Sequence, residues 1–147
     1  MALVSRLLTA RAKERPDSSA FITGADGRAL SWRELAGHGE SWQAVARLRG
    51  LPARARIGVL IGDPLLFAAG YLGALAAGLT AVPLDPRLTE SELAASLARL
   101  RVDVLVTDDP TAWAGVETWA MAHSGPLPVT RPSTTARPSA GAATRPA

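Results

Sequence analysis

Few side chains in this sequence could carry chemistry, and those few lie far apart. The two histidines, His38 and His123, have no obvious carboxylate partner. Isolated histidines are usually surface residues, so we expect neither to act as a general acid or base. Cysteine is absent, which excludes thiol nucleophiles, thiolate zinc sites and disulfides. No metalloprotease or nucleophile-elbow motif occurs, so the sequence predicts no catalytic residue, no cofactor-binding residue and no metal ligand.

The two common sequence motifs that bind nucleotide phosphates are also missing. A dinucleotide fingerprint needs Gly-x-Gly-x-x-Gly after a buried strand, whereas Gly62-Asp63-Pro64-Leu65-Leu66 follows the apolar run 57–61. A phosphate-binding loop needs successive glycines and a lysine, but the only lysine is Lys13, which has no glycine-rich neighbour. From its residues alone, the chain is an α/β segment without a complete catalytic constellation.

The N-terminal third predicts a helix, a hairpin and a second helix. The apolar residues Leu3, Val4, Leu7 and Leu8 recur at helical spacing and predict an amphipathic helix. Residues 19–23 and 28–32 flank a Gly-Ala-Asp-Gly turn and predict a two-stranded hairpin. Ser31 and Glu34 form a capping-box pattern that begins a helix ending near residue 49. Its predicted apolar side consists of Leu35, Trp42, Val45 and Leu48.

The central part predicts parallel-sheet architecture. The apolar run 57–61 is typical of a strand that is buried on both faces. A helix over 65–77, a strand over 81–84, a helix capped by Thr89 and Glu92 that ends near residue 100, and a strand over 102–107 follow. This order predicts a βαβαβ unit. Small residues on one face of the first of these helices predict close packing on the sheet: Gly70, Gly73, Ala74 and Ala77.

The C-terminal part predicts one more helix and then a tail. Residues 111–123 are compatible with a helix in which Trp113 and Trp119 are partly buried. We therefore expect the folded part of the chain to span 1–129. From residue 130 the composition is limited to Arg, Pro, Ser, Thr, Ala and Gly, which predicts disorder over 130–147. Such a tail would arise either from out-of-frame translation of GC-rich DNA or from an interval that precedes a phosphate loop.

Composition excludes several functional classes. With 147 residues, 48% of them hydrophobic and 20% charged, the chain suits one globular domain. The net charge of +3 comes from three arginines after Glu117, so the body is neutral, which argues against nucleic-acid binding. The N-terminus lacks the long apolar stretch of a signal peptide. Residues 64–84 are uncharged, but glycines and Pro83 interrupt them, so we expect no membrane span. We expect a cytoplasmic protein.

Two stretches resemble motifs of the acyl-adenylate-forming, or AMP-binding, superfamily, which includes acyl-CoA synthetases and peptide-synthetase adenylation domains. Leu30-Ser31-Trp32-Arg33-Glu34-Leu35 resembles the first motif, "leucine, Thr/Ser, aromatic, x, Glu, leucine". Leu75-Ala76-Ala77-Gly78-Leu79-Thr80-Ala81-Val82-Pro83-Leu84-Asp85-Pro86 resembles the second, and the separation between the two also matches. The likeness extends over roughly residues 3 to 108 and implies the N-terminal βαβαβ segment of such a synthetase, preceded by a helix and a hairpin.

The resemblance implies an enzyme class that condenses a carboxylic acid with ATP and then passes the acyl group to coenzyme A or to a carrier-protein thiol. In that family the phosphate loop, the residue supporting Mg²⁺, the ribose-binding aspartate and the catalytic lysine all lie downstream of the matched region. None can be placed on this sequence, so the resemblance implies no ATP or Mg²⁺ site here. The two matched motifs are chiefly scaffold in this family, which agrees with the capping role of Ser31 and Glu34.

The resemblance thus predicts an N-terminal portion of an AMP-dependent acyl-CoA synthetase, inactive alone and completed by a second chain. The acyl-CoA branch is favoured slightly by Pro86-Arg87-Leu88-Thr89. Three alternatives stay open: part of a non-ribosomal peptide synthetase adenylation domain, a non-catalytic interaction module or pseudogene remnant, and a nucleotide-binding α/β domain of another family.

Overall fold

The computed structural model describes residues 2–109 and 115–129. Its elements in chain order are α1 (Leu3–Glu14), β1 (Ser19–Ile22), β2 (Ala29–Ser31), α2 (Trp32–Leu48), β3 (Arg56–Leu60), α3 (Pro64–Ala76), β4 (Thr80–Pro83), α4 (Glu90–Arg99), β5 (Val104–Thr107), β6 (Glu117–Ala122) and β7 (Gly125–Pro128). β1 and β2 form an antiparallel hairpin. The other five strands form a sheet in the order β4-β3-β5-β6-β7, in which only β7 runs antiparallel. The predicted helix, hairpin and βαβαβ unit are confirmed.

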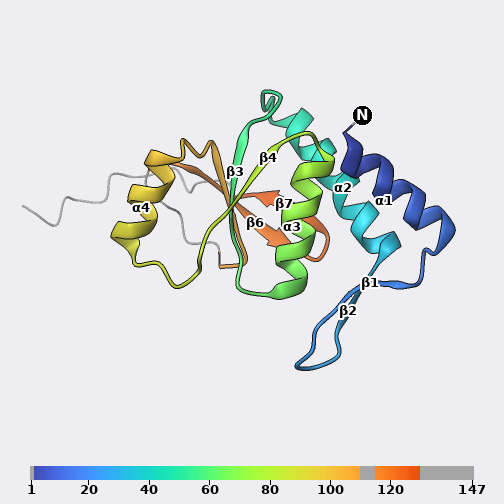
Figure 1. Cartoon of the computed structure of the whole chain (residues 1–147). Coiled ribbons are helices and arrows are strands. Elements are labelled where there is room, and N and C mark those ends of the chain that lie inside the picture. The colour runs from blue at the N-terminus through green and yellow to red at the C-terminus, as the bar shows by residue number, and fades with distance from the viewer. Residues whose placement is uncertain (1, 110–114, 130–147) are drawn as a thin grey trace, which may run out of the picture.

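The central sheet is covered on both faces because its inner strands present apolar residues to both sides. On β3, Ile57 and Val59 point to the core shared with α1, α2 and α3, whereas Gly58 and Leu60 point to the smaller core beneath α4. The strand period of two produces this division. Figure 1 shows α3 on one side of the sheet and α4 on the other. The chain moves from β3 to β4 in one direction and then from β4 past β3 to β5 in the other. Because both crossovers are right-handed, this reversal places their helices on opposite faces of the sheet.

Both predicted capping boxes are formed. At the start of α2, the Glu34 backbone N–H donates to Ser31 Oγ at 3.1 Å, and the Ser31 N–H donates to Glu34 Oε2 at 2.8 Å. At the start of α4, Thr89 and Glu92 make the same reciprocal pair. Each box satisfies backbone donors that a helix would otherwise leave without partners. Ser31 also ends β2, so the hairpin passes directly into α2.

The apolar faces of the first two helices are confirmed only in part. On α1, Val4 and Leu8 pack on the core, but Leu3 and Leu7 are exposed. On α2, Leu35 and Trp42 are fully buried, whereas Leu48 is 82% exposed. Six residues at 3.6 residues per turn place Leu48 about 120° around the helix from Trp42, away from the core.

A polar contact ties the three helices on this face together. The Gln43 side-chain amide on α2 donates to Ser5 Oγ on α1 at 3.2 Å and to the Ala76 carbonyl on α3 at 3.1 Å. This accounts for the burial of Ser5, since a buried hydroxyl group needs a hydrogen-bond partner.

The small residues of α3 allow close packing against two elements, the sheet and α2. A Cβ at Gly70 would meet Ile61 and Val59 of the sheet at 3.0 and 3.7 Å, as predicted. A Cβ at Gly73 would instead fall 2.7 Å from Nε1 of Trp42 on α2. The Trp42 ring then meets Trp119 of β6, with ring centroids 5.9 Å apart and both side chains fully buried. Gly73 thus makes room for one of the two tryptophan side chains that are the largest in the core.

The predicted helix over 111–123 is wrong where the structure describes it. Residues 117–122 form β6, which pairs in parallel with β5, and residues 125–128 return as β7. Trp119 and Met121 alternate into the core, so pairing with β5 and burial override the weak helical pattern. Trp119 is fully rather than partly buried. Residues 111–113, and the predicted disorder of 130–147, lie outside the described residues.

The uncharged stretch 64–84 does not form one helix. It divides into α3 and the edge strand β4, with Gly78 at φ +76° between them. Within the described ranges, no helix combines the length and apolar character needed to cross a bilayer.

We predict that Gly73→Ala lowers the free energy of unfolding by about 1–3 kcal/mol, because the added methyl group displaces the buried Trp42 ring. Gly37→Ala is the matched control. Gly37 also lies inside a helix, but apart from its chain neighbours and the backbone of its own helix no heavy atom lies within 4 Å of the position that its added methyl group would take. We therefore expect a gain of up to about 1 kcal/mol. Urea denaturation followed by circular dichroism measures both. Equal effects of the two substitutions would contradict this packing.

Candidate functional site

The carboxyl ends of β3 and β5 form the edge at which open α/β sheets usually bind ligands. Here two carboxylates fill that edge. Asp63 caps the start of α3, and its Oδ1 accepts from the backbone N–H groups of Leu65 and Leu66 at 2.9 and 3.0 Å. Asp108, just after β5, accepts from the N–H groups of Gly62 and Asp63 at 3.1 and 3.0 Å. The free amides that could cradle a phosphate are therefore occupied by the chain's own side chains.

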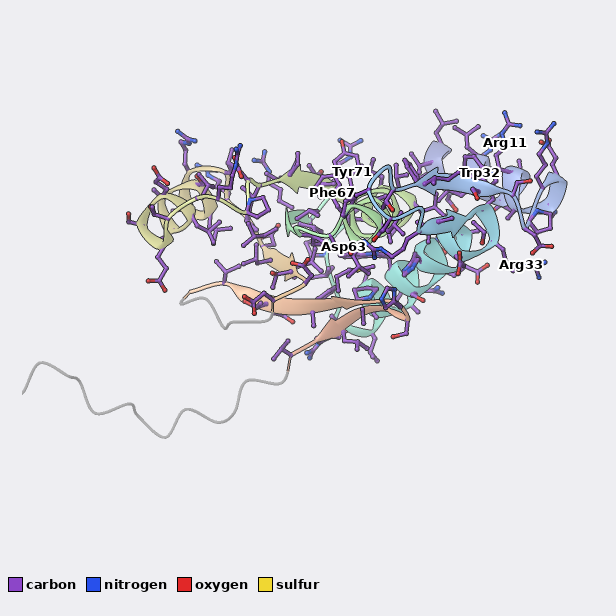
Figure 2. The ribbon with its side chains drawn as sticks, turned by 90° about the horizontal axis from the view of Figure 1, so that it is seen from below. Arg11, Trp32, Arg33, Asp63, Phe67 and Tyr71 are labelled. Carbon is purple, nitrogen blue, oxygen red and sulfur yellow. The ribbon has the colours of Figure 1, made fainter. Side chains whose placement is uncertain are left out.

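The charge at this edge is also unsuitable for a phosphate. Arg28, from the hairpin, contacts Asp63 Oδ2 at 2.9 Å and Asp26 Oδ2 at 2.8 Å. The hydrogen bond from the Leu66 amide is the main reason that the pKa of Asp63 lies below its usual range, and Arg28 lowers it further. Asp63 is therefore ionised at neutral pH, and Arg28 is already shared between two carboxylates. Figure 2 shows Asp63 near the start of α3, with Phe67 and Tyr71 further along the helix.

Lys13 cannot compensate, because it lies in the last turn of α1, a helix that packs on α2 and α3 rather than at the strand ends. Among residues 2–109 and 115–129, no three His, Asp or Glu side chains gather to hold a metal ion. These residues therefore do not fit the triphosphate or the Mg²⁺ of an ATP site, and we derive no catalytic step from them.

A cavity of about 480 Å³ lies between the hairpin, α2, the first turns of α3 and the β6–β7 turn. Its lining combines buried apolar side chains with polar groups: Arg28, Ala29, Leu30, Glu34, Gly37, His38, Ser41, Leu65, Leu66, Ala69, His123 and Ser124. The turn is held against α2 because the Ser41 hydroxyl donates to the Ser124 carbonyl at 3.3 Å. A Cβ at Gly125 would lie 2.7 Å from the Ser41 Cβ, so only glycine permits this approach.

The cavity brings together the two histidines that the sequence separates, and Glu34 lies beside them. The expectation that both histidines lie on the surface is wrong for His38, which is only 6% exposed, whereas His123 is exposed. Burial lowers the pKa of His38; the Glu34 carboxylate opposes this effect, and His123 adds to it slightly. His38 Nδ1 is buried without a hydrogen-bond partner among the described residues. The sequence signal was present, since His38 follows Glu34 by four residues and so lies on the same helix face.

The two family-like motifs occupy framework positions in this arrangement. The first spans the end of β2 and the capping box of α2, and the second spans the end of α3, Gly78 and the edge strand β4. Pro83 lies on that edge strand, where its missing N–H removes no hydrogen bond within the sheet. Both motifs therefore set the positions of elements rather than present reactive groups.

Comparison with known proteins identifies the class. A sequence model of the family described as "AMP-binding enzyme" matches residues 8–142. The chain therefore belongs to the AMP-binding enzyme family, as the two motifs suggested. A relative is tyrocidine synthase 2 of Brevibacillus parabrevis, which is 31% identical over 108 residues, covering 74% of this chain and 3% of that protein.

Solved structures have the same fold. The N-terminal subdomain of Klebsiella oxytoca NpsA in complex with 3-hydroxybenzoyl-AMSN matches with a TM-score of 0.68 and 20% identity, covering 82% of this chain and 30% of that one. NpsA–ThdA, an artificially fused adenylation–PCP di-domain, matches with a TM-score of 0.67 and 22% identity, covering 82% of this chain and 22% of that one. VinN in complex with L-aspartate matches with a TM-score of 0.69 and 25% identity, covering 80% of this chain and 32% of that one. The chain thus spans about a third or less of the length of these proteins.

We predict that the stability of the chain falls as the pH drops below about 6.5, because unfolding lets His38 take up a proton that burial disfavours. The folded-state pKa is below the ordinary value, so this contribution is complete above pH 6.5 and is lost as the pH falls toward the folded pKa. Thermal unfolding between about pH 7 and 5 measures the effect.

His38→Gln should flatten this part of the pH profile, because glutamine does not titrate. His123→Gln should largely preserve it, since burial rather than the neighbouring histidine is the main cause of the shift. An identical acid-dependent loss in wild type and His38→Gln would show that other groups are responsible.

Proposed function

We propose that this chain supplies the N-terminal scaffold of an enzyme that activates a carboxylic acid with ATP, releasing pyrophosphate, and then transfers the acyl group to a thiol. The observation that carries the proposal is the placement of both family motifs on the capping box of α2 and on the α3–β4 connection, within a fold shared with adenylation N-terminal subdomains. ATP would supply the leaving group that makes the carboxylate reactive. The groups that bind ATP and Mg²⁺ would lie outside the residues described here.

The role of this chain's own residues would be to position elements. The Ser31–Glu34 capping box fixes the entry of the hairpin into α2, and the contact between Trp42 and Gly73 fixes α2 on α3. Asp63 and Asp108 hold the turn after β3 with four backbone hydrogen bonds. A rigid frame of this kind is what electrostatic catalysis needs, since the groups that stabilise a transition state must be held in place beforehand.

A carrier-protein thiol is the acceptor that the relatives favour. Tyrocidine synthase 2 and the fused adenylation–PCP protein support it. Coenzyme A is the second candidate, which the stretch Pro86-Arg87-Leu88-Thr89 favours. In the structure Asp85 accepts from the Arg87 backbone and side chain at 2.9 Å each, which shapes the turn leading to the Thr89 cap. This turn has a structural role that either branch could share. We place the protein in the cytoplasm, as the sequence suggests.

We predict that the 147-residue chain alone gives only background ATP–pyrophosphate exchange with a panel of carboxylic acids. The backbone amides at the strand ends already donate to Asp63 and Asp108, and these carboxylates would repel the phosphates of ATP. Exchange well above background by the chain alone would overturn this account of the site.

The scaffold role is tested by replacing the matching segment of NpsA with residues 8–129. We expect the chimera to retain measurable exchange, and the same chimera carrying Gly73→Leu to lose it because α2 and α3 cannot pack. If a chimera that is monomeric and folded by circular dichroism shows no exchange while NpsA does, the scaffold proposal is wrong.

A further inference from the structure

The cavity beside His38 is independent of the adenylation proposal, and its shape is that of a small-molecule site. Its volume of about 480 Å³ lies in the range of ligand pockets. Its inner part is apolar, because Leu30 and Ala69 are buried and Leu65 and Leu66 are half-buried. The polar groups lie on the other walls, from the hairpin, α2 and the β6–β7 turn. A fitting ligand therefore has an aliphatic body and one polar end.

The charge around the cavity determines which charge the polar end of a ligand should carry. Arg28 is paired with Asp26 and Asp63, so these three groups together carry an excess of one negative charge. Glu34 adds a second, since hydrogen bonds from Ser31 lower its pKa and keep it ionised. Glu34 Oε2 accepts from Ser31, while Oε1 accepts no hydrogen bond from the described residues. The cavity therefore has an acceptor and an uncompensated negative charge at its rim.

His38 adds an imidazole ring to the cavity wall. Its side chain is more than nine-tenths buried, lines the cavity and leaves Nδ1 without a partner among the described residues. A neutral imidazole has one bare nitrogen that accepts a hydrogen bond. Nδ1 itself is buried, so a ligand in the cavity would have to reach the other ring nitrogen, Nε2.

We propose that this cavity binds a small protonated alkylamine. Its ammonium group would donate to Glu34 and His38, and its aliphatic chain would lie against Leu65, Leu66 and Ala69. An ammonium group offers three donors and no acceptor, which matches these acceptors and the negative charge. A carboxylate of the same length would face Glu34, and an alcohol would lack the charge.

The ligand class is tested with three compounds of similar shape: 3-methylbutylamine, 3-methylbutan-1-ol and 4-methylpentanoate. Each is titrated into the ¹⁵N-labelled 147-residue chain near pH 7.5, where His38 is neutral, and amide and imidazole shifts are followed by NMR. We expect saturable shifts at Glu34, His38 and Ser124 with the amine, binding of the alcohol at least about fivefold weaker, and no saturable binding of the carboxylate. Equal binding of amine and alcohol, or no saturable binding of the amine, would overturn the proposal.

The second capping box provides a matched control. Glu34→Gln removes the charge but keeps a side chain that can complete a capping box, so the helix start is preserved. Glu92→Gln makes the same change in the box of α4, on the other face of the sheet. We expect Glu34→Gln to weaken amine binding at least about fivefold and Glu92→Gln to leave it unchanged. Equal effects would refute the assignment of Glu34. Because the assay contains no ATP, its outcome is separate from that of the exchange experiments.

Discussion

The contact between α2 and α3 is the interaction on which the rest of the structure depends. The Trp42 ring occupies the space that Gly73 leaves free and extends to Trp119 of β6, so one buried side chain joins two helices and the sheet. The hairpin enters α2 directly through the Ser31 cap, and the β6–β7 turn rests on Ser41 of the same helix. Displacing α2 would therefore move every wall of the His38 cavity except the start of α3.

The carboxyl edge of the sheet shows how one set of residues can stabilise a fold and exclude a function. Asp63 and Asp108 satisfy four amides that would otherwise lack partners, and this fixes the turn after β3. The same amides are then unable to bind a phosphate, and the carboxylates repel one. The residues at this edge are therefore unsuited to hold a triphosphate.

The His38 cavity has the opposite character. There the fold leaves acceptors without donors among the described residues, and the local charge is negative because Arg28 is shared between Asp26 and Asp63. His38 Nδ1 is buried without a partner among these residues, and such groups are uncommon in protein interiors. The turn after β3 lies next to the cavity, because Arg28 of the hairpin contacts Asp63 of that turn.

Local signals in the sequence determined most of the elements, because caps, apolar runs and turn residues act within a few positions. The Ser31 and Thr89 boxes, the βαβαβ order and the family follow from them. The tertiary structure decided the rest. It made residues 117–122 a strand, since β5 offers an edge and a buried position for Trp119, and it turned Gly73 toward α2. It also brought His123 to His38, because proximity between distant residues is set by strand pairing and packing, which a short sequence window does not contain.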